Sequence, residues 1–478
     1  MVNTNRIFKV FLLALILISV LIVSLYGGAL SSAHRLNWEK EQPDLLITDI
    51  TVITNNLLHP EIPEQNVLIQ KGIITTITSD LSDILLDSTT VKVIDGKGKY
   101  VIPGLIDVHA HIEDSSYLAL GLANGITSIR GMRGNDRQLT WRNEINEKKW
   151  LGSRFLVSSP ILDGTEGDMF HHFIETPEHG EQAVKEYSDK GYDYIKLYGE
   201  FNSETYIAII EQAQKQNIPV SKHGPFPVNG LGFNSLITLT SLEHIEDIFS
   251  HEMHYNYNPE LLADLATIYN EINVPIVTTL SVYEELTQLS VQGQDYLAEQ
   301  PLEYMNPAHL ILMTEFGIDR WLNASEKEAK LNQSSFANLL KITKFLHDNN
   351  VQLLVGSDSG ALIGQTGLAT IREIELLGTA GLSNHSALLA ATFNNALALH
   401  IDSDYGSVEQ GKVADLVILE NNPLLNLSAL RDVNAVVIDG YYLNQQKLNS
   451  LKNNALDVQS KWLTFPSIVI DTIRLMFK

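Results

Sequence analysis

The chain contains no cysteine among its 478 residues. Disulfide bonds, thiolate nucleophiles, cysteine metal ligands and cysteine-linked lipid anchors are therefore excluded. Basic residues are also scarce, because 33 Lys and Arg face 57 Asp and Glu, giving a formal net charge of -24. Nucleic acids are bound through basic surfaces, so this balance argues against a nucleic-acid partner. Any bound metal has to be held by His, Asp, Glu or a modified Lys.

Long uncharged runs are rare, and the most prominent one lies near the N-terminus. The stretch VFLLALILISVLIVSLYGGAL follows Arg6 and Lys9. A signal-peptide core has about 7 to 15 apolar residues, whereas a membrane span needs about 20. We therefore expect residues 1–35 to be an N-terminal membrane anchor, with a cleaved signal segment as the alternative. Both predict a membrane-anchored or secreted protein whose catalytic body is periplasmic or extracellular, and the anchor makes the membrane a partner.

Short runs rich in Val, Ile and Thr, separated by turn residues, fill residues 44–103 and return in residues 403–447. This texture is typical of β-strands. We expect the two stretches to combine into one small composite β-sandwich domain. The segment between them, residues 104–402, would then be a single inserted unit, and residues 448–478 would form a C-terminal tail that packs on the body or on a membrane.

The inserted unit alternates apolar runs with amphipathic stretches. Eight strand candidates are GLIDVHAH, ITSIRGM, RFLVSSPIL, YIKLYG, PVSKHG, SLEHI, VPIVTTL and LLVGSD. Strands that alternate with helices indicate a parallel sheet, and eight such units predict an α/β fold of the (β/α)8 TIM-barrel type. Residues 281–350 are longer than one connection needs, so we expect extra helices over the barrel mouth, where substrate choice is often made.

Metal-capable side chains lie at or near the ends of five of these strand candidates. They are His109, His111, Lys196, His223, His244 and Asp358. Active sites of such barrels lie at the carboxyl ends of the strands. Strand side chains alternate, so His109 and His111 face the same side and can hold one cation together. Each residue alone has an ordinary explanation, a hydrogen-bonded histidine or a helix-capping aspartate, but the full set at the correct strand ends favours a metal site for Zn²⁺ or a similar ion.

Lys196 is an unusual member of this set. It stands between Ile195 and Leu197, in a strand that should be apolar on both faces. A buried ammonium is costly unless it is paired. Reaction of the neutral amine with carbon dioxide would give an anion that can bridge two metals. The alternative is a lysine whose amine reaches outward to solvent.

Several segments resemble the successive motifs of the amidohydrolase superfamily, most closely its imidazolonepropionase-like and prolidase-like members. They are VIPGLIDVHAHIEDS, IKLYGE, SKHG, LEHIE, VGSDSG and GSVEQGKVADLVILENNPL. The resemblance spans about residues 44–445. It implies one or two divalent metals held by the five His and Asp residues above, with Lys196 as a carboxylated bridge. It also implies a small-molecule substrate, and a homo-oligomer remains open.

Further residues can take part in catalysis. Asp358 is the expected proton acceptor and donor. Tyr198 lies two residues after Lys196, on the same strand face, and can donate a hydrogen bond to a developing oxyanion, although a packed core tyrosine is an equal alternative. His172 is a second candidate for that task, with its neighbour His171 as the alternative. Arg130 and Arg133, at the end of the second strand candidate, are rare positive charges near the predicted barrel mouth. Arg133 is the candidate for binding a substrate carboxylate, although a surface ion pair is the favoured role for either arginine.

These features predict a hydrolase that cleaves amide, peptide or cyclic amide carbon–nitrogen bonds by attack of a metal-bound hydroxide, for example a dipeptidase. A deaminase or an esterase or lactonase that uses the same site is an enzymatic alternative. A non-catalytic metal-binding barrel is the alternative from another class.

Overall fold

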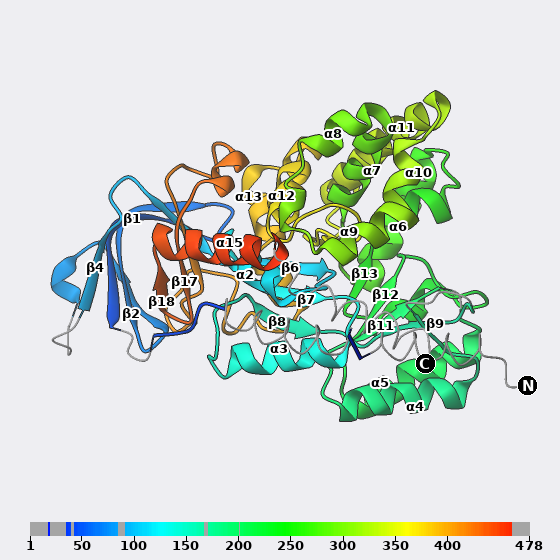
Figure 1. The fold of residues 1–478 in the computed structure, drawn as a ribbon, viewed down its shortest axis with the longest axis horizontal. Coiled ribbons are helices and arrows are strands. Elements are labelled where there is room, and N and C mark those ends of the chain that lie inside the picture. The colour runs from blue at the N-terminus through cyan, green and yellow to red at the C-terminus, as the bar shows by residue number, and fades with distance from the viewer. Residues whose placement is uncertain are drawn as a thin grey trace, which may run out of the picture.

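The computed structural model describes residues 18–19, 35–39, 43–84, 91–166, 171–199 and 201–460. Within these ranges the chain has an α/β fold, with one mainly antiparallel sheet at one end and a helix-covered parallel region at the other (Figure 1). The expected anchor, residues 1–35, lies outside the described residues apart from Ile18, Ser19 and Arg35. The expected tail is described as far as Ser460.

The predicted location needs a correction. A span requires about 20 apolar residues in one helix. No helix in the part of the chain that the structure describes is long and apolar enough to cross a membrane. The prediction of a membrane-anchored or secreted protein, with the membrane as a partner, is therefore not retained.

The antiparallel sheet draws its strands from both flanks of the chain. Its order is β18-β17-β16-β5-β1-β2-β3, and β4 pairs with β1. The N-terminal flank supplies β1 (Asp44–Ile53), β2 (Glu61–Gln70), β3 (Ile73–Thr78), β4 (Val91–Asp95) and β5 (Tyr100–Pro103). The C-terminal flank supplies β16 (Leu416–Leu419), β17 (Val433–Ile438) and β18 (Tyr441–Leu443). Alternate residues of β1 and its neighbours, including Leu45, Ile47 and Val67, bury one apolar face.

Parallel strands follow in two further sheets. One has the order β6 (Leu105–Ala110), β7 (Ile126–Gly131) and β8 (Arg154–Val157). The other has the order β10 (His171–Phe173), β9 (Ile161–Asp163), β11 (Ile195–Tyr198), β12 (Val220–His223), β13 (Ser241–Glu243), β14 (Ile276–Val277) and β15 (Leu353–Leu354). Every one of the eight strand candidates contains one of these strands.

Backbone hydrogen bonds also join the two parallel sheets to each other. Ser159 N donates to Tyr194 O at 2.7 Å, which links the end of β8 to the start of β11. On the other side, Asp358 N donates to His109 O at 2.8 Å and His111 N donates to Ser359 O at 2.7 Å. The chain that follows β15 is therefore held against the end of β6, and this contact brings the first and last predicted ligands together.

Helices follow most of the parallel strands, as the alternating pattern predicts. They are α2 (Ser115–Ala123), α3 (Asp136–Asn146), α4 (Pro177–Asp189), α5 (Ser203–Gln216), α6 (Pro259–Ile272), α12 (Leu368–Ala380), α13 (Asn384–Ala390) and α14 (Phe393–Ala398). α15 (Gln445–Ser460) packs against α2, and its Leu448 and Leu451 join the main apolar core. Residues 448–460 of the expected tail therefore lie on the body.

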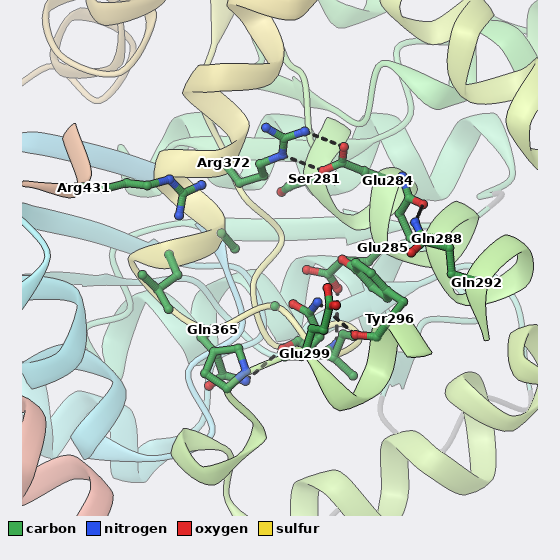
Figure 2. A pocket seen from close by; sticks show the side chains of 16 residues that line it. Ser281, Glu284, Glu285, Gln288, Gln292, Tyr296, Glu299, Gln365, Arg372 and Arg431 are labelled. Atoms are coloured by element: carbon green, nitrogen blue, oxygen red, sulfur yellow. Dashed lines mark hydrogen bonds and ion pairs between the residues drawn. The ribbon is translucent and has the colours of Figure 1, made fainter. Parts of the chain in front are cut away.

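The stretch after β14 is helical, as its length predicts. It contains α7 (Leu280–Gln292), α8 (Gln294–Ala298), α9 (Pro307–Met313), α10 (Asp319–Leu322) and α11 (Glu326–Asp348), which project from the parallel region in Figure 1. A polar cavity of about 380 Å³ opens between α7, α8 and α12 (Figure 2). In this cavity Arg372 pairs with Glu284, and Glu285 accepts a hydrogen bond from Ile363 N at 3.2 Å. Glu285 thereby fixes the loop that follows Asp358.

Candidate metal centre

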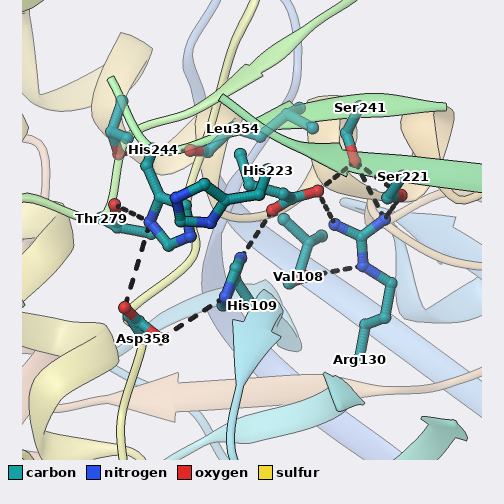
Figure 3. Close-up of polar contacts among 12 residues, drawn as sticks. Val108, His109, Arg130, Ser221, His223, Ser241, His244, Thr279, Leu354 and Asp358 are labelled. Atoms are coloured by element: carbon teal, nitrogen blue, oxygen red, sulfur yellow. Dashed lines mark hydrogen bonds and ion pairs between the residues drawn. The ribbon is translucent and has the colours of Figure 1, made fainter. Parts of the chain in front are cut away.

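Three predicted ligands from distant parts of the sequence meet at the carboxyl ends of the parallel strands. His109 lies in β6, His244 directly follows β13, and Asp358 lies four residues after β15. One ligand atom from each lies within 4.8 Å of the other two, and all three residues are buried. Figure 3 shows these side chains turned toward a common space.

His111 and His223 extend this cluster on two sides. His111 Nε2 lies 3.0 Å from Asp358 Oδ1, and His109 Nε2 lies 3.4 Å from the same atom. The ring of His223 lies 4.3 Å from that of His244, centroid to centroid. His223 Nε2 also lies 3.2 Å from Asp247 Oδ2. Asp358 is therefore the meeting point of the first two histidines, while His223 and His244 form a second pair.

Burial sets the protonation of these imidazoles. It lowers the pKa of His109 and holds that of His223 well below the ordinary value. It also lowers the pKa of His244 to about 3. Neutral imidazoles keep a nitrogen lone pair for a cation. Burial opposes ionisation of Asp358, but the neighbouring His109 and His111 outweigh it and keep the pKa of that carboxyl below its ordinary range.

Lys196 lies in this region as a buried amine. The residue is 2% exposed, and its Nζ has no hydrogen-bond partner among the described residues. Burial lowers the pKa of Lys196 to about 8, and the charge of Glu243 partly opposes this shift. The outward-reaching lysine that the sequence left open is therefore not what the structure shows. An amine with this pKa is partly neutral near pH 7, the form that can react with carbon dioxide.

The donor set fits a divalent metal. Asp358 Oδ1 is buried without a hydrogen-bond partner in the described chain, although two imidazole Nε2 atoms lie within 3.4 Å of it. A cation between these atoms would satisfy all three. Imidazole nitrogens with a carboxylate are the ligands that Zn²⁺ and its neighbours prefer.

A buried network orients the first ligand (Figure 3). His109 Nδ1 lies 2.6 Å from Glu243 Oε2, and Arg130 Nη2 donates to Glu243 Oε1 at 2.9 Å. The same guanidinium donates to the hydroxyls of Ser221 and Ser241. Burial opposes ionisation of Glu243, but the Arg130 charge outweighs it and holds its pKa below the ordinary range. A carboxylate on Nδ1 leaves Nε2 of the ring for the metal.

Arg130 therefore differs from its expected position. The sequence indicated a positive charge near the site mouth, engaged with substrate or in a surface ion pair. In the structure Arg130 is 0% exposed and its ion pair with Glu243 is internal.

Two further residues fix the strand ends. Asp107 accepts from His109 N at 3.1 Å and from Ser357 N at 3.0 Å, which ties β6 to the chain before Asp358. Thr279 Oγ1 lies 3.0 Å from His244 Nδ1.

The backbones of His244, Thr279 and Asp358 have φ angles of 69°, 47° and 52°. Left-handed conformations at non-glycine residues cost free energy and gather at functional sites, where the surroundings enforce them.

The sequence did not identify Glu243, Asp107 or Thr279 as functional. A usable signal existed for the two acids, because each interrupts a strand that is otherwise buried on both faces. The strand-end pattern indicates residues that can bind metal directly, whereas these acids act through the residues beside them.

The remaining predicted site residues have defined neighbours. The Tyr198 ring lies 3.9 Å from that of His223, and the His171 ring lies 4.7 Å from Tyr198. His172 instead contacts α4, with Nδ1 2.7 Å from Tyr187 Oη. Arg133 forms an ion pair with Glu113. Tyr198 is thus beside the cluster, and the catalytic role of His172 and the substrate role of Arg133 stay predictions.

Neutral imidazoles and a carboxylate at the carboxyl ends of parallel strands define the class of metal-dependent hydrolases on an α/β fold. The sequence matches the Amidohydrolase family over residues 100–443, and the chain belongs to this family. It is therefore a hydrolytic enzyme that acts on carbon–nitrogen bonds, and the non-catalytic alternative is not retained.

Individual relatives are distant. A 5'-deoxyadenosine deaminase of Methanosphaera stadtmanae is 24% identical over 456 residues, covering 85% of this chain and 95% of that protein. Among solved structures, a bottromycin amidohydrolase superposes with a TM-score of 0.71 at 19% identity, covering 88% of this chain and 91% of that one. A Xaa-Pro dipeptidase superposes with a TM-score of 0.64 at 18% identity, covering 84% of this chain and 100% of that one. The solved structures support the shared fold.

Proposed function

We propose that this enzyme hydrolyses a carbon–nitrogen bond of a small-molecule substrate with the help of one or two divalent metals, Zn²⁺ first among them. The observation that carries the proposal is the buried His109–His244–Asp358 cluster, in which one carboxylate oxygen has no hydrogen-bond partner among the described residues. Five direct ligands, His109, His111, His223, His244 and Asp358, would hold the metals. A carboxylated Lys196 would bridge them.

We further propose that residues 104–402 form a closed (β/α)8 barrel. The hydrogen bonds between β8 and β11, and between β6 and the chain after β15, support closure. Residues 44–103 and 403–447 would form the small composite β-domain, which the shared sheet supports. In this arrangement all the predicted ligands belong to one face of one barrel.

Bound metal would supply an activated water and polarise the bond to be cleaved. The chain's own residues would handle protons and charge. Asp358 would accept the proton of the attacking water and return it to the leaving nitrogen. Tyr198 would donate a hydrogen bond to the oxygen that gains negative charge, with His172 as a second candidate. Arg133 would bind an acidic group of the substrate, although Glu113 competes for its guanidinium.

The leading candidate for the reaction is hydrolytic deamination of an aminated ring. The curated relatives are named 5'-deoxyadenosine deaminases and cover most of this chain. These relatives favour the deaminase alternative over the dipeptidase that the sequence first suggested.

Amide or dipeptide cleavage is the second candidate, favoured by one observation. The Lys196 amine is buried beside the cluster and has no hydrogen-bond partner in the part of the chain that the structure describes. A bridging anion at this position would support two metals, which can activate water and polarise an amide carbonyl at the same time.

A substrate screen on the zinc-loaded protein tests both candidates. Adenosine and 5'-deoxyadenosine should release ammonia if the leading candidate is right, whereas Xaa-Pro dipeptides and N-acyl amino acids should release an amino acid if the second is right. Cyclic amides and lactones complete the panel. Turnover of lactones alone, by fully metal-loaded protein, would overturn the proposed function.

A further inference from the structure

His309 brings a buried, unpartnered nitrogen from the inserted helices to the metal centre. It is the third residue of α9 and is 2% exposed. Its Nε2 has no hydrogen-bond partner among the described residues. A buried polar nitrogen without a partner costs free energy, so its retention calls for an explanation.

Contacts on two sides place this side chain beside the ligands. Asn306, the cap of α9, donates through its side chain to Asp114 Oδ2 at 3.2 Å, three residues after His111. The backbone of Gly360 hydrogen-bonds the His309 ring. Gly360 itself abuts His111, because a Cβ on Gly360 would lie 2.4 Å from His111 O. His309 is therefore one residue removed from a predicted metal ligand.

The hydrogen bond with Gly360 determines which ring nitrogen is available. A backbone carbonyl accepts, so the ring nitrogen that meets it carries the proton. Nε2 has no partner among the residues that the structure describes, so we assign the proton to Nδ1. Burial lowers the pKa of His309 to about 4, which is consistent with a neutral ring beside His111 and Arg133 despite the opposing charge of Glu113. Nε2 of this tautomer is a hydrogen-bond acceptor.

We propose that His309 Nε2 accepts a hydrogen bond from an N–H group of the substrate, and so selects substrates that carry a donor beside the bond to be cleaved. The inference rests on the proposed carbon–nitrogen hydrolysis, because secondary amides and aminated rings both carry such a group, whereas the tertiary amide of an Xaa-Pro dipeptide does not. α9 comes from the insertion after β14, so a segment outside the strand-end motifs contributes to substrate choice. Arg133 and Glu113, which pair with each other, both act on the pKa of His309, so their charges lie near its ring.

The test pairs a change in the enzyme with a change in the substrate. His309→Phe keeps a ring of similar shape and removes the acceptor. With the best substrate of the screen, this variant should raise KM roughly tenfold, the size expected for one lost hydrogen bond, at unchanged metal content. N-methylation of the substrate should raise the KM of the parent by a similar factor and the KM of His309→Phe very little. His347→Phe, a half-buried histidine on α11, is the matched control.

Each result decides the question. An unchanged KM in His309→Phe, or an equal penalty for N-methylation in parent and variant, overturns the inference while leaving the hydrolase intact. Loss of metal from His309→Phe would show a structural role and also overturn it. Calorimetric binding of the same compounds to Asp358→Asn gives affinities without turnover. If the parent neither binds nor hydrolyses any carbon–nitrogen compound, the proposed function fails, and the inference fails with it.

Discussion

The Asp358 carboxylate lies close to three of the predicted histidine ligands. Its oxygens face His109 and His111 at 3.4 and 3.0 Å and His244 at 3.9 Å. Its backbone is bonded to His109 O, and its φ of 52° turns the side chain out of the strand direction. These contacts support the proposal that Asp358 acts both as a metal ligand and as the base. Its replacement should therefore affect chemistry more than folding.

Asp358→Asn should lower kcat by at least a hundredfold, because the amide keeps the shape but cannot accept the proton. Part of the metal should remain, since four of the five direct ligands are intact. Steady-state kinetics and metal analysis measure both effects. Asp348→Asn, on the surface of α11, is the control and should behave like the parent. A variant that turns over near the parent rate would show that another group is the base.

Lys196→Met should have opposite effects on the apo protein and on metal binding. Methionine fills a similar volume without burying an unpartnered amine, so the unfolding free energy of the metal-free protein should rise by about 1–3 kcal/mol. Metal content per chain should fall, because no carboxylated bridge can form. Urea unfolding and metal analysis test the two effects.

Lys222 is the matched control on the neighbouring strand. It is equally buried, but its Nζ donates to His223 O at 2.9 Å and to Gly224 O. Lys222→Met should therefore lower stability rather than raise it. If Lys196→Met keeps two tightly bound metals and full activity, Lys196 is a purely structural residue.

At the scale of elements, the hydrophobic pattern predicted the parallel strands well because their side chains are buried on both faces. The third candidate, RFLVSSPIL, is an instructive exception, since it contains β8 and the first two residues of β9. Pro160 lies between them and cannot donate to a strand neighbour, so the chain bends there.

The hydrophobic pattern could not predict contacts between residues that are far apart in the sequence. Arg130 pairs with Glu243, and Ser357 donates to Asp107. Both contacts depend on which strands become neighbours, and that is decided by the packing of the whole structure. Sequence periodicity reports the face on which a residue lies. It does not report the partner that the residue meets there, and Arg130 was misplaced for that reason.

The start of α7 is held by a neighbouring helix rather than by its own cap. Thr279 makes no side-chain cap bond. Glu373 of α12 instead accepts from Leu280 N at 2.9 Å and from Ser281 N at 2.6 Å. Burial raises the pKa of this carboxyl to about 7, above its ordinary 4.5. Between about pH 4.5 and pH 7, the folded protein therefore retains a proton on Glu373 that the unfolded chain releases.

This difference in protonation predicts that the free energy of unfolding depends on pH. The stability that protonated Glu373 contributes is complete below pH 4.5 and is lost as pH rises through about 7. Glu373→Gln, which cannot ionise, lacks this loss. The unfolding free energy of the parent relative to the variant should fall by up to about 3 kcal/mol between pH 5 and pH 8. Urea unfolding across this range measures it, with exposed Glu326→Gln as control. If the difference in unfolding free energy between parent and variant stays constant across this pH range, the raised pKa of Glu373 is contradicted.

At the scale of the whole molecule, the proposed metal centre would connect β6, β12, β13 and the chain after β15. Chelation should therefore abolish activity and lower the Tm. A ligand that binds only the folded state stabilises it by about 4 kcal/mol at a thousandfold excess over its Kd. Differential scanning fluorimetry before and after zinc is restored measures the shift. An unchanged Tm, with metal loss verified by elemental analysis, would show that the centre contributes nothing to stability.

The pairing of β5 with β16 has a consequence for how the protein is made. Pro103 pairs with Leu416, so one edge of β5 finds its neighbour only after the intervening chain has been translated. At about 5–20 residues per second, the ribosome needs roughly 15 to 60 seconds for that distance. Throughout this interval the nascent chain carries an unpaired, apolar strand edge, the kind of surface that recruits other chains. Production of this enzyme should therefore depend on chaperones that shield nascent chains, and slow translation should aggravate aggregation.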